Sequence, residues 1–254
     1  MGCTQMLKPD LKLDLQAAID KRLSRRKYTA RPIEPDKVEM LQSSITAFNK
    51  YEQVKMQFVL NNGDAFISFR KSYGLLTGVQ NYVALIASPD DIIAMEKLGY
   101  YGECLVLQAT NMGLGTCWVA AFDRGACTAS LDENERVVCT ITIGYAPEDL
   151  STKEKLIRWG THRKTKSVEQ MYVSDTPPPE WFIKGMEAVQ KAPSAVNRQP
   201  VVFTYENGKV TAAVDDIRSE CRAFDLGIAK LHFELGAGSG SWMFGNGGMY
   251  AYGG

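Results

Sequence analysis

A run of three prolines, Pro177 to Pro179, is the feature that most restricts how this chain can fold. Proline lacks a backbone N–H and clashes with the preceding turn of a helix, so three in succession cannot lie inside a helix or a central strand. The run therefore predicts a break in the chain, followed by a new helix. It divides the 254 residues into a longer part, residues 1–174, and a shorter part, residues 175–254.

Helical and strand patterns mix on both sides of this break without regular alternation. The irregular order favours an α+β fold over a doubly wound parallel sheet. Residues 151–166 are polar and basic, and we expect them to form a surface loop. Apolar residues at helical spacing predict helices over residues 14–24, 35–48, 90–112, 180–191 and 224–235. Runs rich in apolar and β-branched residues predict strands over residues 54–60, 81–88, 136–144, 201–205 and 209–214.

The composition excludes several classes of protein. The chain carries 29 basic and 29 acidic residues, and a formal net charge of zero disfavours a general nucleic-acid surface. No apolar run approaches the roughly 20 residues needed to span a bilayer, and the charged residues that follow Met6 leave no apolar core for a signal peptide. We therefore expect a cytoplasmic protein with no nucleic-acid and no membrane partner.

Cysteine and histidine usage argues against metal and disulfide chemistry. The six cysteines form no C-x-x-C pair, and Cys104, Cys117 and Cys139 lie in apolar stretches that are typical of buried thiols. With only His162 and His232 in the chain, a histidine-rich metal centre is excluded. Neither a G-x-S-x-G elbow nor a phosphate-binding P-loop occurs. We expect no metal site and no catalytic side-chain triad.

Arg22, Ser24 and Arg26 form a first candidate site, at the end of the first predicted helix. Guanidinium groups bind phosphate in bidentate fashion, and a serine hydroxyl adds a further donor. The alternative is a solvated cationic helix end, which the helix dipole favours. Charge alone favours this alternative.

A second candidate site is the segment from Ala192 to Pro200, between a predicted helix and a predicted strand. It is dense in turn-forming residues and short polar side chains. Asn197 and Gln199 carry paired donors and acceptors, which suit the edge of a heteroaromatic ring. The alternative is a plain helix-to-strand loop in which serine and asparagine cap backbone groups.

A third candidate is the turn from Gly113 to Trp118, which continues through Ala120. Such a turn can present backbone N–H groups to a ligand, or it can be a helix end with a packed tryptophan. Loops around residues 66–78 and the glycine-rich tail from Gly236 onward would set the choice of substrate. The tail is compatible with an ordered loop over a ligand or with a flexible segment, and the sequence does not decide between the two.

Together these motifs resemble the FMN-dependent nitroreductase family. The spacing Arg22-x-Ser24-x-Arg26 is similar to its amino-terminal Arg-Ser-Arg element, and residues 192–200 are similar to its flavin-edge loop. Residues 113–118, followed by residues 143–147, resemble its later signature. The resemblance spans about residues 14–235. It implies a nitroreductase-like fold with a central, mostly antiparallel sheet flanked by helices.

The resemblance also implies a cofactor and the residues that bind it. FMN is expected, with Arg163 resembling part of the basic pair near its phosphate and with residues 118–121 lying along the ring. NADH or NADPH is expected as the transient electron donor, and no side-chain acid or base is required. The expected cofactor-binding residues are Arg22, Ser24, Arg26, Trp118, Ala120, Arg163, Pro193, Ser194, Ala195, Asn197 and Gln199.

One departure from the family pattern concerns the order of the motifs. In the family, the flavin-edge loop follows soon after the Arg-Ser-Arg element, and two identical chains exchange these loops. Here residues 43–57 lack the loop motif, which instead follows the triple proline. This arrangement resembles the TM-nitroreductase branch of the family. It implies a pseudo-dimer within one chain, with residues 1–174 as the first half and residues 175–254 as a degenerate second half.

The implied activity is electron transfer from a nicotinamide nucleotide, through FMN, to a small acceptor of the nitroaromatic or quinone type. One flavin per chain and a monomer are expected, although a higher oligomer is compatible with the sequence. Relatives of this fold also perform dehalogenation, azoline oxidation and flavin breakdown, and nothing in the sequence selects among these. A separate alternative is a catalytically degenerate flavin-binding protein with a storage or regulatory role.

Overall fold

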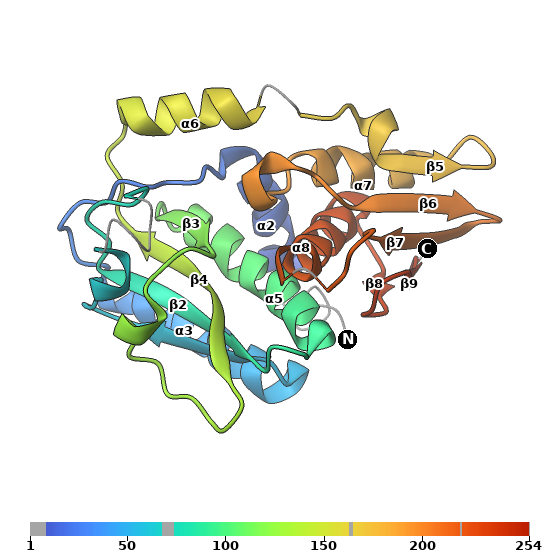
Figure 1. Cartoon of the computed structure of the whole chain (residues 1–254). Coiled ribbons are helices and arrows are strands. Elements are labelled where there is room, and N and C mark those ends of the chain that lie inside the picture. Colours follow the sequence, from blue (N-terminus) through green and yellow to red (C-terminus); the bar gives the residue numbers. More distant parts are fainter. Residues whose placement is uncertain (1–8, 68–73, 163–164, 219, 254) are drawn as a thin grey trace. The chain divides into compact units, whose positions relative to one another are not determined.

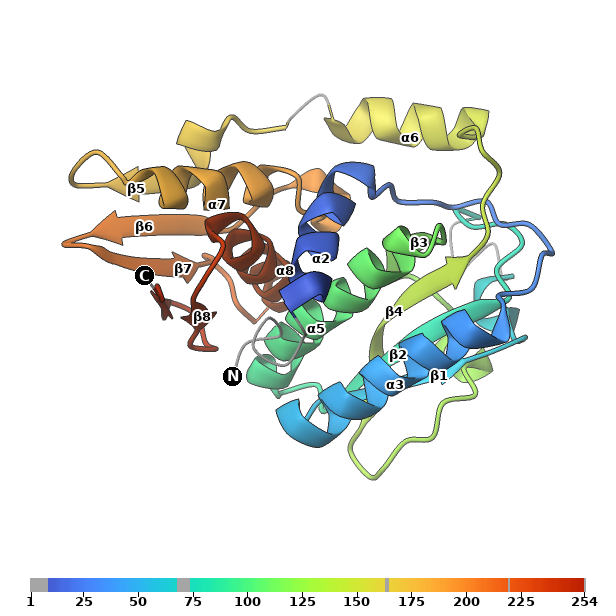
Figure 2. The same cartoon turned by 180° about the vertical axis from the view of Figure 1, so that it is seen from behind.

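The computed structural model describes residues 9–67, 74–162, 165–218 and 220–253 (Figures 1 and 2). The chain forms two compact units. The first, which we call the four-stranded unit, contains residues 21–91 and 105–160. The second, the five-stranded unit, contains the residues up to 20, residues 92–104 and the residues from 161 on.

The four-stranded unit is built on an antiparallel sheet. Its strands are β1 (Lys55–Val59), β2 (Asn81–Ala87), β3 (Gly115–Val119) and β4 (Arg136–Gly144), in the order β1-β2-β4-β3. Strand β2 is buried along its whole length, which explains why its sequence is almost continuously apolar. Helix α3 (Pro35–Glu52) lies across one face of this sheet (Figure 2) and buries Leu41, Ile45 and Phe48.

The five-stranded unit holds a second sheet in the order β5-β6-β7-β9-β8. The strands are β5 (Tyr172–Ser174), β6 (Val202–Glu206), β7 (Lys209–Ala213), β8 (Ser241–Trp242) and β9 (Gly248–Ala251). Only β5 and β6 run parallel. The hairpin between β6 and β7 turns at Asn207 and Gly208, which both have positive φ, as the Asn-Gly signal predicts.

The glycine-rich tail is ordered in this unit, because it supplies β8 and β9. Its aromatic residues join a cluster of rings around α7 (Glu180–Gln190). Trp181 stacks on Tyr252 with ring centroids 4.2 Å apart, and Trp242 contacts Phe233 at 5.5 Å. The tail is therefore part of the second sheet and its core.

Helix α8 (Glu220–Ala237) packs closely against the first part of α5 (Ile92–Asn111) within the five-stranded unit. A Cβ atom on Gly227 would lie 1.9 Å from the Glu96 carbonyl oxygen, and one on Gly99 would lie 2.4 Å from the Phe224 carbonyl oxygen. Neither site has room for a side chain. The two helices approach at these glycines backbone to backbone.

Three buried polar pairs link the same two helices. Lys230 Nζ donates to Glu96 Oε1 at 2.5 Å, Tyr100 donates its hydroxyl to Glu234 at 2.5 Å, and His232 Nε2 lies 3.1 Å from Glu103 Oε1. Buried charged groups are costly unless they are paired and hydrogen-bonded. These pairs therefore fix the register of α5 on α8.

The predicted elements are largely confirmed, with one clear exception. Residues 151–166, expected as a loop, contain helix α6 (Thr152–His162). Ser151 and Glu154 form the start of this helix, because the Glu154 carboxylate accepts from both the N–H and the hydroxyl of Ser151. This serine-x-x-glutamate spacing is a helix-start signal, which the polar composition of the segment obscured.

Three further expectations need correction. The mostly antiparallel pairing is confirmed, but it is divided between two sheets and does not form a single central one. Cys117 and Cys139 are buried thiols as expected. Cys104 is disulfide-bonded, and its partner lies outside the described residues. Helix α2 (Pro9–Lys21) also begins earlier than predicted.

The compact units do not coincide with the predicted halves, residues 1–174 and 175–254. The first part of α5 and the residues up to 20 belong with the carboxyl-terminal segment. The close contact of α5 with α8 accounts for the grouping of residues 92–104. That residues 1–174 and 175–254 are the two halves of a duplicated chain stays a prediction.

Gly227→Ala tests the close approach of the two helices. The added methyl would overlap the α5 backbone, so we expect the free energy of unfolding to fall by about 2 kcal/mol. Gly160→Ala in α6 is the matched control, since a Cβ atom there meets nothing within 4 Å. The control should gain up to about 1 kcal/mol from helix propensity. Urea denaturation measures both, and equal effects would contradict the packing described.

Candidate functional site

The candidate site begins at the extended segment from Arg22 to Tyr28 in the four-stranded unit. Backbone hydrogen bonds hold it on two sides: Arg25 N donates to Thr116 O at 2.8 Å, and Tyr28 N donates to Thr77 O at 2.9 Å. The Tyr28 hydroxyl adds bonds to Thr142 Oγ1 at 2.7 Å and to Arg25 O at 2.8 Å. The segment is therefore fixed to the edge of β3.

The alternation of side chains along this segment separates its arginines. Arg22, Ser24 and Arg26 come together as predicted: Arg22 Nη1 lies 3.5 Å from Ser24 Oγ, and Arg26 Nη1 lies 3.5 Å from Ser24 O. All three side chains are half-buried. Among the described residues, no carboxylate lies within ion-pair distance of Arg26. The set is thus a cationic cluster beside a serine hydroxyl.

Arg25 points away from this cluster and has a structural role. Its guanidinium donates to Pro147 O at 2.6 Å and to Asp149 O at 3.1 Å, and its Nε donates to Glu154 Oε1 at 3.3 Å. A Cβ atom on Gly115 would lie only 2.9 Å from the Arg25 side chain. Arg25 is therefore packed into the fold.

Glu154, on α6, organises the whole segment. Its Oε1 accepts from the backbone N–H of Arg26 at 2.7 Å and of Lys27 at 3.3 Å, and its side chain is only 2% exposed. Burial by itself would raise the pKa of this carboxyl. The Arg26 N–H, the Ser151 hydroxyl and N–H, and the Arg25 charge oppose burial and lower the pKa to about 2. Glu154 was not among the predicted site residues, although its spacing from Ser151 is a helix-start signal.

Strand β3 brings the third candidate motif to the cationic cluster. Ser24 bridges to Thr116, Trp118 follows two residues later on β3 and is half-buried, and Ala120 is exposed where the strand has ended. Burial raises the pKa of the neighbouring Cys117 thiol, while the charges of Arg26 and Arg22 lower it. The positive potential of the cluster therefore reaches β3.

The second candidate motif lies in the five-stranded unit, where it forms the short helix η4 (Ala195–Asn197) and its flanks. Ser194 Oγ accepts from Gln199 N at 2.9 Å. The Asn197 amide donates to Thr161 O and to Thr165 Oγ1, each at 3.1 Å. The motif is therefore an ordered loop closed by its own polar side chains.

The Gln199 side chain is 4% exposed and bonded inside the same unit. Its Oε1 accepts from Lys166 N at 2.8 Å, and its Nε2 donates to Gln190 O at 3.0 Å. Pro193 and Ala195 flank Ser194 in this loop. Arg163, the remaining predicted residue, lies outside the described residues.

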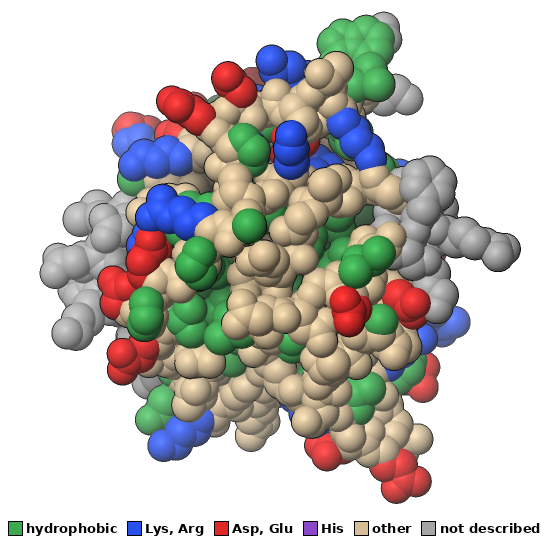
Figure 3. Space-filling model, turned by 90° about the vertical axis from the view of Figure 1, so that its left-hand side faces the viewer, with side chains coloured by type: hydrophobic (Ala, Val, Ile, Leu, Met, Phe, Trp, Pro, Cys, Tyr) green, Lys and Arg blue, Asp and Glu red, His purple; other side chains and the backbone are tan. Residues whose placement is uncertain are grey.

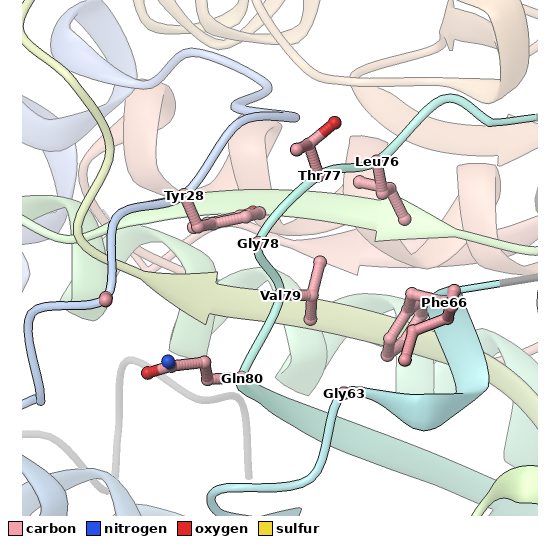
Figure 4. Close-up of a pocket in the computed structure, with 10 residues that line it drawn as sticks. Tyr28, Gly63, Phe66, Leu76, Thr77, Gly78, Val79 and Gln80 are labelled. Carbon is pink, nitrogen blue, oxygen red and sulfur yellow. The ribbon is translucent and has the colours of Figure 1, made fainter.

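A pocket of about 590 Å³ in the four-stranded unit lies beside Tyr28 and extends along residues 76–80 (Figure 4). Phe66 and Val79 point into it from the two chain segments that form its walls (Figure 4). It lies next to the cationic segment, since Thr77 N donates to Arg26 O at 2.9 Å. Its lining residues within the described part of the chain are uncharged: Tyr28, Ala30, Gly63, Phe66, Ile67, Leu76, Thr77, Gly78, Val79 and Gln80.

Two other kinds of site are not found in the described part of the chain. No group of three or more metal-ligating side chains occurs there, and none of its helices has the length and apolar content to cross a membrane. On the face shown in Figure 3, acidic and basic side chains are interspersed and do not gather by sign.

The sequence matches the family described as "Putative TM nitroreductase" over residues 14–237. The chain belongs to this nitroreductase family. It is therefore an oxidoreductase by family, with an α+β fold. No curated protein matches the sequence.

A solved structure with a TM-score above 0.5 shows the same fold, and two others have lower scores. A "putative nitroreductase" of Thermotoga maritima is 21% identical, with a TM-score of 0.63 over 93% of this chain and 91% of its own. An FMN-dependent nitroreductase of Clostridium difficile R20291 is 18% identical, with a TM-score of 0.43 over 52% of this chain and 87% of its own. A nitroreductase family protein of Clostridium difficile 630 is 17% identical, with a TM-score of 0.47 over 65% of this chain and 98% of its own.

The residues of this nitroreductase fit the phosphate of a flavin nucleotide. A phosphate needs several convergent donors and positive charge, and Arg22, Ser24 and Arg26 supply two guanidinium groups and a hydroxyl on one side of a fixed segment. Arg26 has no competing carboxylate among the described residues. The acidic neighbour, Glu154, is directed to the backbone N–H groups and to Arg25.

Glu154→Gln tests the anchor of this segment. Both carboxylate oxygens accept hydrogen bonds, Oε1 from the backbone N–H groups of Arg26 and Lys27 and Oε2 from the N–H and hydroxyl of Ser151. The glutamine amide has only one accepting oxygen, so the free energy of unfolding should fall by about 2 kcal/mol at pH 7. The pKa of Glu154 is about 2, below its ordinary 4.5, so its contribution is complete above pH 4.5 and is lost as the pH falls to 2. The difference between wild type and variant should shrink over that range.

Glu148→Gln is the control for this variant, because Glu148 is an exposed carboxylate of the same unit. It should change the free energy of unfolding by less than about 0.5 kcal/mol. Chemical denaturation at several pH values measures both variants. A Glu154→Gln effect that is equally small, or that stays constant down to pH 2, would refute the anchoring role.

Proposed function

We propose that the protein is an FMN-dependent oxidoreductase that passes electrons from NADH or NADPH to a small organic acceptor of the nitroaromatic or quinone type. The observation that carries this proposal is the convergence of Arg22, Ser24 and Arg26 on a segment fixed by Glu154, in a chain of the nitroreductase family. The FMN-dependent relative from Clostridium difficile agrees with it by name.

In this proposal the protein positions FMN and supplies charge to it. Arg22 and Arg26 bind the phosphate, the Ser24 hydroxyl donates to it, and Arg163 adds a further cation. Residues 118–121 lie along the ring and offer a backbone N–H to it. FMN, when bound, supplies the hydride chemistry, so no side-chain acid or base is required. The guanidinium groups of the cluster favour negative charge on the bound cofactor.

The loop from Pro193 to Gln199 is proposed to contact the same FMN. The resemblance supports this assignment for Pro193, Ser194, Ala195, Asn197 and Gln199. Because the chain has one Arg-Ser-Arg element and one such loop, the proposal includes one flavin per chain and an internal pseudo-dimer that works as a monomer. A cytoplasmic location, where nicotinamide nucleotides are abundant, completes it.

The uncharged pocket beside Tyr28 supports a neutral acceptor. Phe66 and Tyr28 contribute aromatic surface to it. Apolar pockets with a few polar groups are typical of small-molecule sites. Nitroaromatics and quinones have these properties.

The competing function is a flavin-binding protein without turnover. One observation favours it: the Gln199 amide is buried and bonded to Lys166 N and Gln190 O. It could reach a ring edge only by breaking these bonds. A storage or regulatory protein would retain the phosphate cluster and lose the active ring edge.

Arg26→Ala tests the phosphate site. Loss of a charged hydrogen-bonding partner should cost about 1.5–3 kcal/mol, which is a tenfold to hundredfold weaker affinity for FMN. Arg31→Ala is the matched control, because Arg31 is an exposed arginine bonded to Glu34. Fluorescence titration of FMN measures both. Unchanged affinity of Arg26→Ala for FMN would show that the phosphate binds elsewhere.

Flavin content and reduction test the function as a whole. We expect about one FMN per chain after reconstitution, a monomeric mass by light scattering, and bleaching of the flavin absorbance by NADH or NADPH under anaerobic conditions. Two flavins per chain, or none, would refute the site. Flavin that binds but is reduced by neither nucleotide would favour the competing function.

A further inference from the structure

Asp225, on α8, lies directly beneath the loop from Pro193 to Gln199. The Ala195 N–H is shared between its two carboxyl oxygens, at 3.0 Å from Oδ1 and 3.3 Å from Oδ2. Asp225 is 5% exposed. Within the described residues, this single N–H is the only hydrogen-bond donor to the carboxyl. A buried charge needs more than one hydrogen-bond partner, so the ionised form of the carboxyl is disfavoured while the loop covers it.

The loop itself is held in an unfavourable backbone conformation. Val196, Asn197 and Gln199 have φ values of 46°, 55° and 46°, in the left-handed region that β-branched residues in particular avoid. Such a conformation persists only where surrounding contacts impose it. The hydrogen bond from Ala195 to Asp225 is one of these contacts, so its loss would allow the backbone of the loop to relax.

A small cavity of about 10 Å³ separates the loop from α8. Ser194 and Gln199 line it from the loop, Asp225 and Ala229 line it from the helix, and Met171 closes it. This space holds at most about one water molecule. Full solvation of the carboxylate therefore requires the loop to move away.

The charged and titratable groups around Asp225 are few. Arg222 and Cys221 share its helix, and Arg198 follows η4; Arg222 is paired with Asp215 at 3.2 Å. Lys166 bonds to the backbone of Gln199 on the loop. In the part of the chain described, none of these cations lies within ion-pair distance of Asp225.

Burial is the largest influence on the pKa of Asp225 and raises it from 3.8 to about 7. The Ala195 N–H and the charges of Arg222 and Arg198 lower it and offset burial only in part. The covered carboxyl therefore holds a proton that the exposed carboxyl would release between about pH 4 and pH 7. Covering the carboxyl is favoured at low pH and becomes less favourable as the pH rises through this range.

We propose that Asp225 is a positioning residue for the flavin-edge loop: the neutral carboxyl holds residues 193–199 closed over α8, and the carboxylate drives them open. The link of this loop to FMN rests on the proposed function. The coupling of the loop to Asp225 rests only on contacts within the five-stranded unit and does not depend on the proposed function. The pH of the surroundings would thereby set the position of the flavin-edge loop.

Hydrogen exchange of the loop in the flavin-free protein tests the coupling. The pKa of about 7 when covered, against 3.8 when exposed, makes opening about tenfold more frequent at pH 8 than at pH 6. After correction for intrinsic exchange rates, amides of residues 195–199 should lose about tenfold in protection between these pH values. Amides of β6 in the same unit should change little.

Asp225→Asn should abolish this pH dependence and keep high protection at both pH values, because its side-chain oxygen still accepts from Ala195 and carries no charge. Asp216→Asn, an exposed aspartate of the same unit, is the matched control and should behave as wild type. Equal protection at pH 6 and pH 8 in wild type, or a persisting pH dependence in Asp225→Asn, would overturn the proposal.

Addition of FMN separates the two proposals. At pH 8, saturating FMN should raise the protection of residues 195–199 in wild type, since a ligand that contacts the closed loop stabilises it. Failure of FMN to bind, or binding without added protection, would refute the role of the loop at the flavin. The pH dependence of the flavin-free loop would then still decide the role of Asp225.

Discussion

The five-stranded unit depends on the close approach of α5 and α8 at Gly99 and Gly227. Because these glycines let the two backbones touch, the polar side chains on either side are excluded from water and must satisfy one another. The Lys230–Glu96 pair illustrates the consequence. It also binds the tail, since Lys230 donates to Met243 O and Gly245 O, and Glu96 accepts from Gly245 N. One helix contact thus orders a segment that sequence alone left undecided.

The candidate phosphate site depends in the same way on a single buried group. Glu154 bonds to the backbone of Arg26 and Lys27 and to the side chain of Arg25. It engages the backbone and the structural arginine, and the guanidinium groups of Arg22 and Arg26 are left on the opposite side of the segment. A carboxylate next to a cationic site usually weakens it by charge neutralisation. Here the carboxylate fixes the geometry of the site, because its bonds are directed to peptide N–H groups.

In the flavin-edge loop, residues 193–199, the polar side chains bond chiefly to other residues of the protein. Asn197 and Gln199 close the loop on Thr161 and Lys166, while Asp225 remains beneath it with one donor. The loop is therefore tied firmly along its length and weakly at its base. Among these contacts, the one with Asp225 is the one whose charge changes between about pH 4 and pH 7.

Local patterns of periodicity, turn chemistry and alternation along a strand were enough to predict the fold class, most helices and strands, the Asn-Gly hairpin and the grouping of Arg22, Ser24 and Arg26. They did not predict helix α6, where polar composition outweighed the Ser151–Glu154 signal, or the disulfide at Cys104. The division into two sheets, the role of Glu154, the internal bonding of Gln199 and the buried carboxyl of Asp225 became visible in the folded chain alone. The physical reason is that burial and pairing depend on which distant segments meet: Glu154 lies 128 residues from Arg26, and Asp225 lies 30 residues from Ala195. No local pattern carries that information.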